Sequence, residues 1–105
     1  MNDDDARFIH TVIYAEMMRQ EALENYEVCS EIQEHLSLLG SYVLGYCEWS
    51  SIQQLVYMYA RLLGSLQSID PEGVTFELGG RLFYFYVDED ERTHLKRSIG
   101  SKSKK

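Results

Sequence analysis

The stretch "VTFELGGRLFYFYV", residues 74–87, decides the fold class, because its apolar side chains alternate instead of recurring at helical spacing. The pair Gly79-Gly80 between two alternating runs is typical of a two-residue hairpin turn. Pairing the runs across this turn puts four apolar residues on one face, namely Val74, Phe76, Phe83 and Phe85. We therefore predict a two-stranded antiparallel β-hairpin with this face turned inward.

The opposite face of the hairpin is unusually apolar for a surface exposed to water. It carries Thr75, Glu77, Leu82, Tyr84 and Tyr86. Tyrosine buries a large area with little loss of conformational freedom and is enriched in protein interfaces. Tyr84 and Tyr86 are therefore predicted to contact a partner; the alternative is that they line the rim of a small core.

A second amphipathic helix is expected before the hairpin. It begins at Ser50 or Ser51 and reaches about Ser68, with apolar residues spaced by three, four and seven. The sequence "DPEG" at 70–73 is typical of a turn. Gly40 is expected to end the preceding helix, with Gly45 as a second flexible point in the corner that follows.

The N-terminal third contains no proline and no glycine between Asp3 and Leu39. This predicts a long N-terminal helix, continuous over roughly 50 Å or broken once, and the sequence does not decide between the two. Residues 8–18 are apolar on every side of the helix, which requires cover from the same domain or from another chain. A homodimer is therefore expected.

Residues 21–36, "EALENYEVCSEIQEHL", separate into an apolar side and an acidic side on a helical wheel. The acidic side carries Glu24, Glu27, Glu31 and Glu34. Carboxylates at this spacing lie roughly 5–6 Å apart along a helix, close to the step between phosphates of a nucleic-acid strand. These four glutamates are predicted to contact a basic surface on a larger protein, either as a mimic of nucleic acid or by simple charge attraction.

The C-terminal segment "DEDERTHLKRSIG" predicts a short helix capped by Asp88, with Glu91 three residues later. The prediction for the whole chain is one α+β domain over residues 1–99, with a flexible basic tail at 100–105. Its elements are a long N-terminal helix, a second amphipathic helix, a two-stranded hairpin and a short C-terminal helix.

Charge is divided unevenly along the 105 residues. Residues 1–91 hold all 17 acidic residues and four basic ones, whereas residues 92–105 hold six basic residues, for a net charge of −7. Three interpretations compete: both regions serve solubility, the basic end contacts phosphate or an acidic partner, or the acidic side of the helix is the binding surface. The net charge disfavours general affinity for nucleic acid or for anionic membranes.

The sequence offers little catalytic chemistry. It contains no HExxH, CxxC, GxGxxG or P-loop motif, and we expect no cofactor and no metal ion. Cys29 and Cys47 are expected to be reduced thiols, with Cys47 as the nucleophile of a third, weaker hypothesis, a small enzyme. No apolar run is long enough for a membrane span, and Asp3, Asp4 and Asp5 replace the basic start of a signal peptide, so a cytoplasmic location is expected.

We therefore expect a non-enzymatic protein-interaction module, an acidic regulator or inhibitor of a larger protein. The alternative from another class is a nucleic-acid-binding regulator that uses the basic segment from Arg92 to Lys105. In size and charge alone the chain is similar to secretion chaperones and to phage proteins that disable host machinery, and this likeness transfers no residue.

Overall fold

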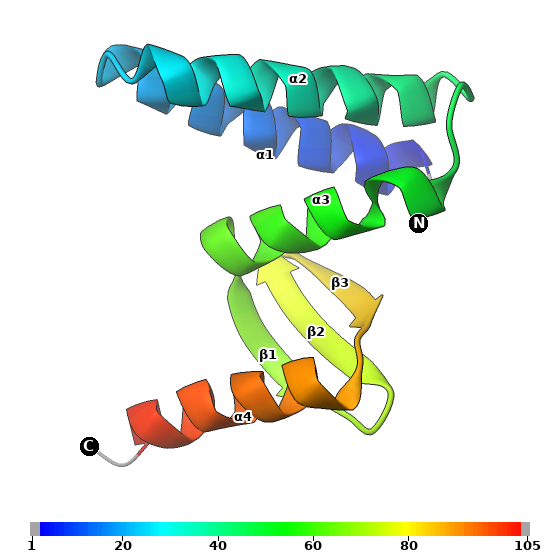
Figure 1. Cartoon of the computed structure of the whole chain (residues 1–105), viewed down its shortest axis with the longest axis vertical. Helices are drawn as coiled ribbons and strands as arrows, with labels where there is room; N and C mark the ends of the chain where they lie inside the picture. The colour runs from blue at the N-terminus through cyan, green and yellow to red at the C-terminus, as the bar shows by residue number, and fades with distance from the viewer. Residues whose placement is uncertain (1–2, 104–105) are drawn as a thin grey trace. The chain divides into compact units, whose positions relative to one another are not determined.

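The computed structural model describes the backbone of residues 3–103 and the side chains of residues 3–98. Its elements, shown in Figure 1, are α1 (Asp3–Ala22), α2 (Tyr26–Val43), α3 (Trp49–Leu63), β1 (Ser65–Ile69), β2 (Gly73–Leu78), β3 (Arg81–Tyr86) and α4 (Glu89–Ser103). The α+β class agrees with the sequence. Local contacts divide the chain into two compact units between Tyr59 and Ala60. The single domain expected over residues 1–99 stays a prediction.

The long N-terminal helix is not continuous. It breaks at residues 23–25, and α1 and α2 lie antiparallel and side by side (Figure 1). The end of α1 has the two hydrogen bonds of a Schellman motif: Asn25 N–H donates to the Gln20 carbonyl at 2.9 Å, and Glu24 N–H donates to the Glu21 carbonyl at 3.0 Å. Glu24 occupies the left-handed position of this motif, with φ of +61°.

The end of α2 has a second Schellman motif, with glycine, the usual residue, in the left-handed position. Gly45 has φ of +86°, its N–H donates to Tyr42, and Tyr46 N–H donates to Ser41. Gly40, which we expected to end the helix, lies inside α2 instead. The left-handed conformation is favourable for glycine and unfavourable for a residue with a Cβ atom. The first break has a glutamate at this position instead of a glycine, so the sequence does not indicate where it lies.

The sheet has three antiparallel strands in the order β1-β2-β3, so the expected two-stranded hairpin is wrong. We assigned residues 65–68 to the second helix because Leu66 continues its apolar spacing. The helix ends at Leu63, and Gly64 follows at a close approach of backbones: a Cβ atom there would lie 2.5 Å from the Glu77 carbonyl oxygen. Leu66 then pairs with Phe76 as a strand residue.

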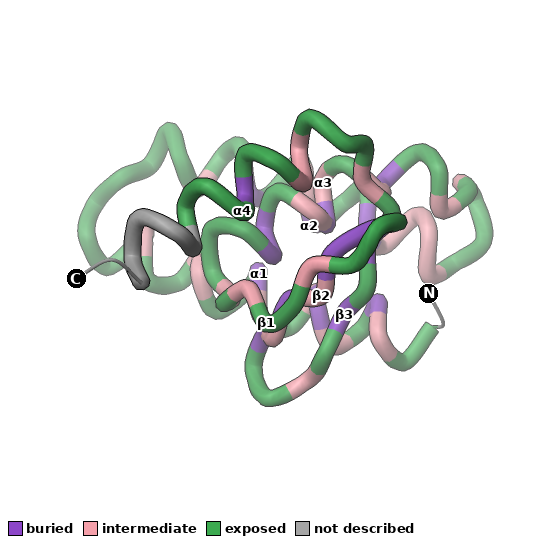
Figure 2. The backbone as a smooth tube through the Cα atoms, turned by 90° about the horizontal axis from the view of Figure 1, so that it is seen from below, coloured by how far each residue is buried: buried purple, intermediate pink, exposed green. Residues whose placement is uncertain are grey.

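The register predicted for the hairpin is confirmed, with Leu78 opposite Arg81 at the turn. Both turn glycines have positive φ, as a tight hairpin turn of this length requires. The predicted inner face is buried, and burial alternates along β2 and β3 (Figure 2). The buried residues of these two strands are Gly73, Val74, Phe76, Leu78, Phe83 and Phe85.

Helix α4 begins where predicted, since Asp88 Oδ1 accepts a hydrogen bond from Glu91 N–H at 2.9 Å. Its backbone continues to Ser103, so it is as long as α3 rather than short. The side chains of residues 99–103 and all of residues 104–105 lie outside the described part, and the flexibility of the tail at 100–105 stays a prediction.

The two Schellman motifs predict opposite effects of opposite substitutions. Glu24→Gly should raise the free energy of unfolding by about 0.5–1 kcal/mol, because it removes a Cβ atom from a left-handed residue. Gly45→Ala should lower it by a similar amount, since a Cβ atom at Gly45 meets nothing within 4 Å and the strain is that of the backbone alone. Urea unfolding measures both; a loss of stability in Glu24→Gly would contradict the assignment.

Candidate interaction surfaces

Three of the four predicted glutamates share one face of α2. We call Glu27, Glu31 and Glu34 the acidic face; all three are exposed. At 1.5 Å per residue they extend over about 10 Å of the helix. No ion pair among the described side chains involves any of them. Their negative charge is therefore not neutralised by the described cationic groups.

Glu24 does not join the acidic face. It lies in the turn between α1 and α2 and is exposed there, in the left-handed conformation. The apolar side predicted for this region is also shorter than expected, since Tyr26 is 64% exposed while Ile32 and Leu36 are buried. The break in the helix therefore shortens the row of carboxylates, which weakens its likeness to a nucleic-acid strand.

A polar contact that the sequence did not reveal lies beside the acidic face. His35 Nδ1 of α2 and the hydroxyl of Tyr59 in α3 are 2.7 Å apart. Burial raises the pKa of Tyr59 to about 12, with further contributions from the charges of Glu31 and Glu16. Because the hydroxyl stays protonated at neutral pH, it has a proton to donate in this contact. The two residues are 24 positions apart in the sequence, so the local spacing of residues within a helix does not indicate this contact.

The two predicted tyrosines lie together on the open side of the sheet. We call Leu82, Tyr84 and Tyr86 the outer sheet face; they are 67%, 41% and 70% exposed. The rings of Tyr84 and Tyr86 contact edge to face, with centroids 5.1 Å apart. This exposure agrees with the face assignment made from the alternation of residues 74–87.

Tyr84 also has a structural role, which the sequence did not indicate. Its hydroxyl donates to Asp70 Oδ1 at 2.9 Å, and the same oxygen accepts the N–H groups of Glu72 and Gly73 at 2.8 Å. A Cβ atom at Gly73 would lie 2.9 Å from the Tyr84 ring and closer still to a backbone carbonyl. The ring of Tyr84 thus leans over Gly73 and fastens β3 to the loop before β2.

These hydrogen bonds change the acidity of both partners. The backbone N–H of Glu72, then the Tyr84 hydroxyl, lower the pKa of Asp70 below its ordinary value. Desolvation, followed by the bond to the Asp70 carboxylate, raises the pKa of Tyr84 to about 12. Tyr84 is therefore a partly fixed side chain, and Tyr86 is the more available of the two.

The basic segment is partly engaged within its own unit. Arg92 donates to the Val87 carbonyl. Directly before the segment, Glu91 Oε2 of α4 lies 3.1 Å from Arg61 Nη1 of α3. Lys96 and Arg97 are exposed, whereas Lys102, Lys104 and Lys105 fall outside the described side chains. The described part therefore offers two exposed cations from this segment.

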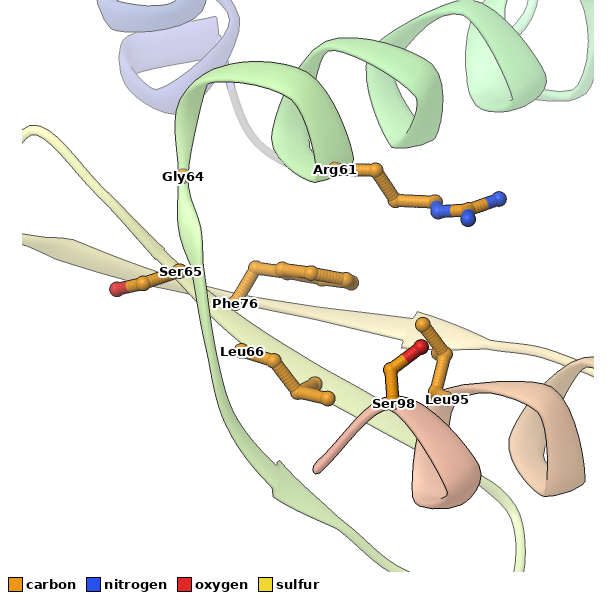
Figure 3. Close-up of a pocket in the computed structure, with 7 residues that line it drawn as sticks. All are labelled: Arg61, Gly64, Ser65, Leu66, Phe76, Leu95 and Ser98. Atoms are coloured by element: carbon orange, nitrogen blue, oxygen red, sulfur yellow. The ribbon is translucent and has the colours of Figure 1, made fainter. Parts of the chain in front are cut away.

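A hollow of about 390 Å³ lies in the second unit. Figure 3 shows the residues that line it. Its lining consists of Arg61, Gly64, Ser65, Leu66, Phe76, Leu95 and Ser98. Phe76, Leu66 and Leu95 supply an apolar wall. Among the described side chains, the one charged lining residue is Arg61, which pairs with Glu91. A smaller hollow of about 350 Å³ lies between the first turns of α1 and the end of α2.

The two cysteines are free thiols. Cys29 Sγ lies 3.5 Å from the Met17 carbonyl, and Cys47 Sγ lies 3.8 Å from the Leu38 carbonyl. Among residues 3–98, no group of three or more histidine, cysteine and acidic side chains is placed to hold a metal ion. Within the same described part, no helix combines the length and the apolar character needed to cross a membrane.

Comparison with protein-family models, with curated proteins and with solved structures finds no match to this chain. What can be said about function therefore comes from the two surfaces described above, the acidic face and the outer sheet face.

The bond between Tyr84 and Asp70 makes a prediction that nuclear magnetic resonance can test. In Tyr84→Phe the pKa of Asp70 should rise toward its ordinary value, because the carboxylate loses a donor. A titration of the Asp70 carboxyl carbon measures this. The matched control is Tyr86→Phe, which removes a hydroxyl without a hydrogen-bond partner among the described residues. An equal pKa in both variants would contradict the bond.

The same variant should change the acid sensitivity of the fold. The folded pKa of Asp70 is lowered, so its contribution to stability is present above the unfolded pKa of about 3.9 and disappears as pH falls through the folded value. Tyr84→Phe should therefore lose less stability than the parent over that acid range, as measured by urea unfolding at a series of pH values.

Proposed function

We propose that this chain is a non-enzymatic protein-interaction module that binds a larger protein with a basic surface and regulates or inhibits it. The observation that carries the proposal is the acidic face: three exposed carboxylates on one side of α2, none of them in an ion pair with a described side chain. Uncompensated charge of one sign steers a partner of the opposite sign and speeds its association.

The outer sheet face supports the same proposal in a different way. Charge attraction at an exposed surface contributes little affinity by itself, because solvent and salt screen it. Exposed aromatic and aliphatic side chains provide the area that a stable interface buries. Tyr86 and Leu82 are the most exposed members of this face, and we assign them the role of contacts, with Tyr84 holding the strand in place beside them.

The proposal includes a cytoplasmic location, which the free thiols of Cys29 and Cys47 support. The nucleic-acid-binding alternative would rest on Arg92 and the cations that follow it. It has weaker support, since Arg92 already donates to the backbone carbonyl of Val87 and the net charge of the chain is −7.

Charge reversal on the acidic face tests the proposal. The double variant Glu27→Lys with Glu34→Lys should reduce capture of proteins from a lysate of the native cell at low salt by roughly 10-fold or more, because two attractive charges become repulsive. Glu31 is left unchanged, since its charge also acts on Tyr59. Capture by tagged protein, followed by mass spectrometry at low and high salt, measures the effect.

The matched control changes the net charge equally at other exposed positions, with Glu48→Lys and Glu89→Lys. Partners specific to the acidic face should be retained by this control, lost from the first variant, and released from the parent by salt. Equal capture by the two double variants would show that only total charge matters and would contradict the proposed site. Capture of nucleic acid that depends on residues 100–105 would favour the alternative.

A further inference from the structure

The free edge of β3 differs from the opposite edge of the same sheet. Within residues 3–103, β3 pairs with β2 alone, so it forms one edge, and β1 forms the other. The β1 edge is interrupted by a bulge between Leu66 and Ser68 and carries the exposed polar residues Ser65, Gln67 and Ser68. A bulge is one of the devices that prevent a further strand from pairing at an edge. The β3 edge has no bulge in its pairing with β2, and no proline or lysine.

The register shows which backbone groups of β3 are unpaired. Beyond the end of the strand, Val87 N–H donates to the Glu72 carbonyl of the neighbouring chain segment, so odd-numbered residues direct their backbone groups toward β2. In an antiparallel pair this direction alternates along the strand. The N–H and C=O groups of Leu82, Tyr84 and Tyr86 therefore point to the open edge.

The side chains leave this edge accessible. The ring of Tyr84 leans over Gly73 of β2 and is held there by Asp70, so it does not cover its own backbone on the open side. Leu82 and Tyr86 are largely exposed. Residues 82–87 carry no charged side chain, although the chain as a whole is acidic, so two copies can approach here without repulsion between charges of the strand itself.

We propose that β3 pairs antiparallel with β3 of a second copy of this chain, about a two-fold axis at Tyr84. This register places Leu82 opposite Tyr86 of the second copy and Tyr84 opposite its own equivalent, all on the outer sheet face. It uses every outward backbone group of the three residues, in roughly six hydrogen bonds. The interaction is self-complementary, as a two-fold interface must be.

This inference goes beyond the proposed function, because it assigns the dimer to the edge of β3, whereas the sequence indicated residues 8–18 for dimerisation. The dimer was expected from residues 8–18, in which Ile9 and Ile13 are fully buried within one chain while Tyr14 and Met18 are exposed, so a dimer through that segment stays a prediction. Pairing at β3 would join two three-stranded sheets into one of six strands and place both outer sheet faces side by side. The acidic face of α2 takes no part, so failure of the partner-capture experiment would leave this proposal intact.

Two double variants with the same loss of apolar area test the register. Leu82→Lys with Tyr86→Lys places like charges opposite one another across the axis, whereas Leu82→Lys with Tyr86→Glu places opposite charges there. Sedimentation should show the parent with the mass of two chains at about 100 μM. The dissociation constant of the lysine pair should exceed that of the lysine–glutamate pair by roughly 100-fold.

Amide hydrogen exchange of the parent keeps the proposal testable if a variant does not fold. In the dimer the amides of Leu82, Tyr84 and Tyr86 should exchange slowly, and dilution should release them while Phe83 and Phe85 stay protected. A parent with the mass of one chain at 100 μM, or equal dissociation constants for the two variants, would overturn the proposal. Protection of these amides only on addition of another protein would replace the second copy by a foreign strand and would also overturn it.

Discussion

Successive side chains of a β-strand point to opposite faces of the sheet, and this alternation determines which residues of β3 are buried and which are exposed. Its odd-numbered residues Phe83 and Phe85 are buried, and its even-numbered residues remain exposed. The same parity applies to the backbone, because the even-numbered residues also direct their N–H and C=O groups away from β2. One residue in two therefore presents both an aromatic or aliphatic side chain and an unpaired backbone to the outside.

The Asp70 carboxylate connects this exposed surface to the rest of the sheet. One oxygen accepts the backbone N–H groups of Glu72 in the loop and of Gly73 at the start of β2, together with the hydroxyl of Tyr84. Gly73 is the residue that lets the tyrosine ring approach so closely. The loop, β2 and β3 are thus held in one arrangement, which fixes the position of Tyr86 next to Tyr84. A contact surface with fixed side chains loses less conformational entropy when it binds.

In the first unit, the left-handed residue Glu24 has a comparable effect on the acidic face. Glu24 lies in the turn where α1 ends and α2 reverses direction, so it is not part of the row of carboxylates on α2. Three glutamates remain on α2, close to the partly buried contact between His35 and Tyr59. The charge of Glu31 already acts on that contact, so Glu27 and Glu34 are the members of the face most clearly available to a partner.

The sequence predicted those features that depend on local periodicity. The hairpin register, its two faces, the exposure of Tyr84 and Tyr86 and the Asp88 cap all follow from residue spacing, and the structure confirms them. The sequence failed where a distant contact overrides the local pattern. Leu66 fits a helix and a strand equally well, and the close approach of Gly64 to Glu77 ends the helix. The sequence left open whether the first helix breaks, and it did not locate the break at Glu24 because a glutamate stands where the motif usually has glycine.

The division of β3 into a covered and an open side can be measured in solution with a soluble paramagnetic reagent added to dilute, isotopically labelled protein. The reagent broadens the signals of groups that solvent reaches. We predict strong broadening for the side chains of Leu82 and Tyr86 and little for those of Phe83 and Phe85. Equal broadening of the two sets, or protection of Leu82 and Tyr86 in the dilute protein, would contradict the account.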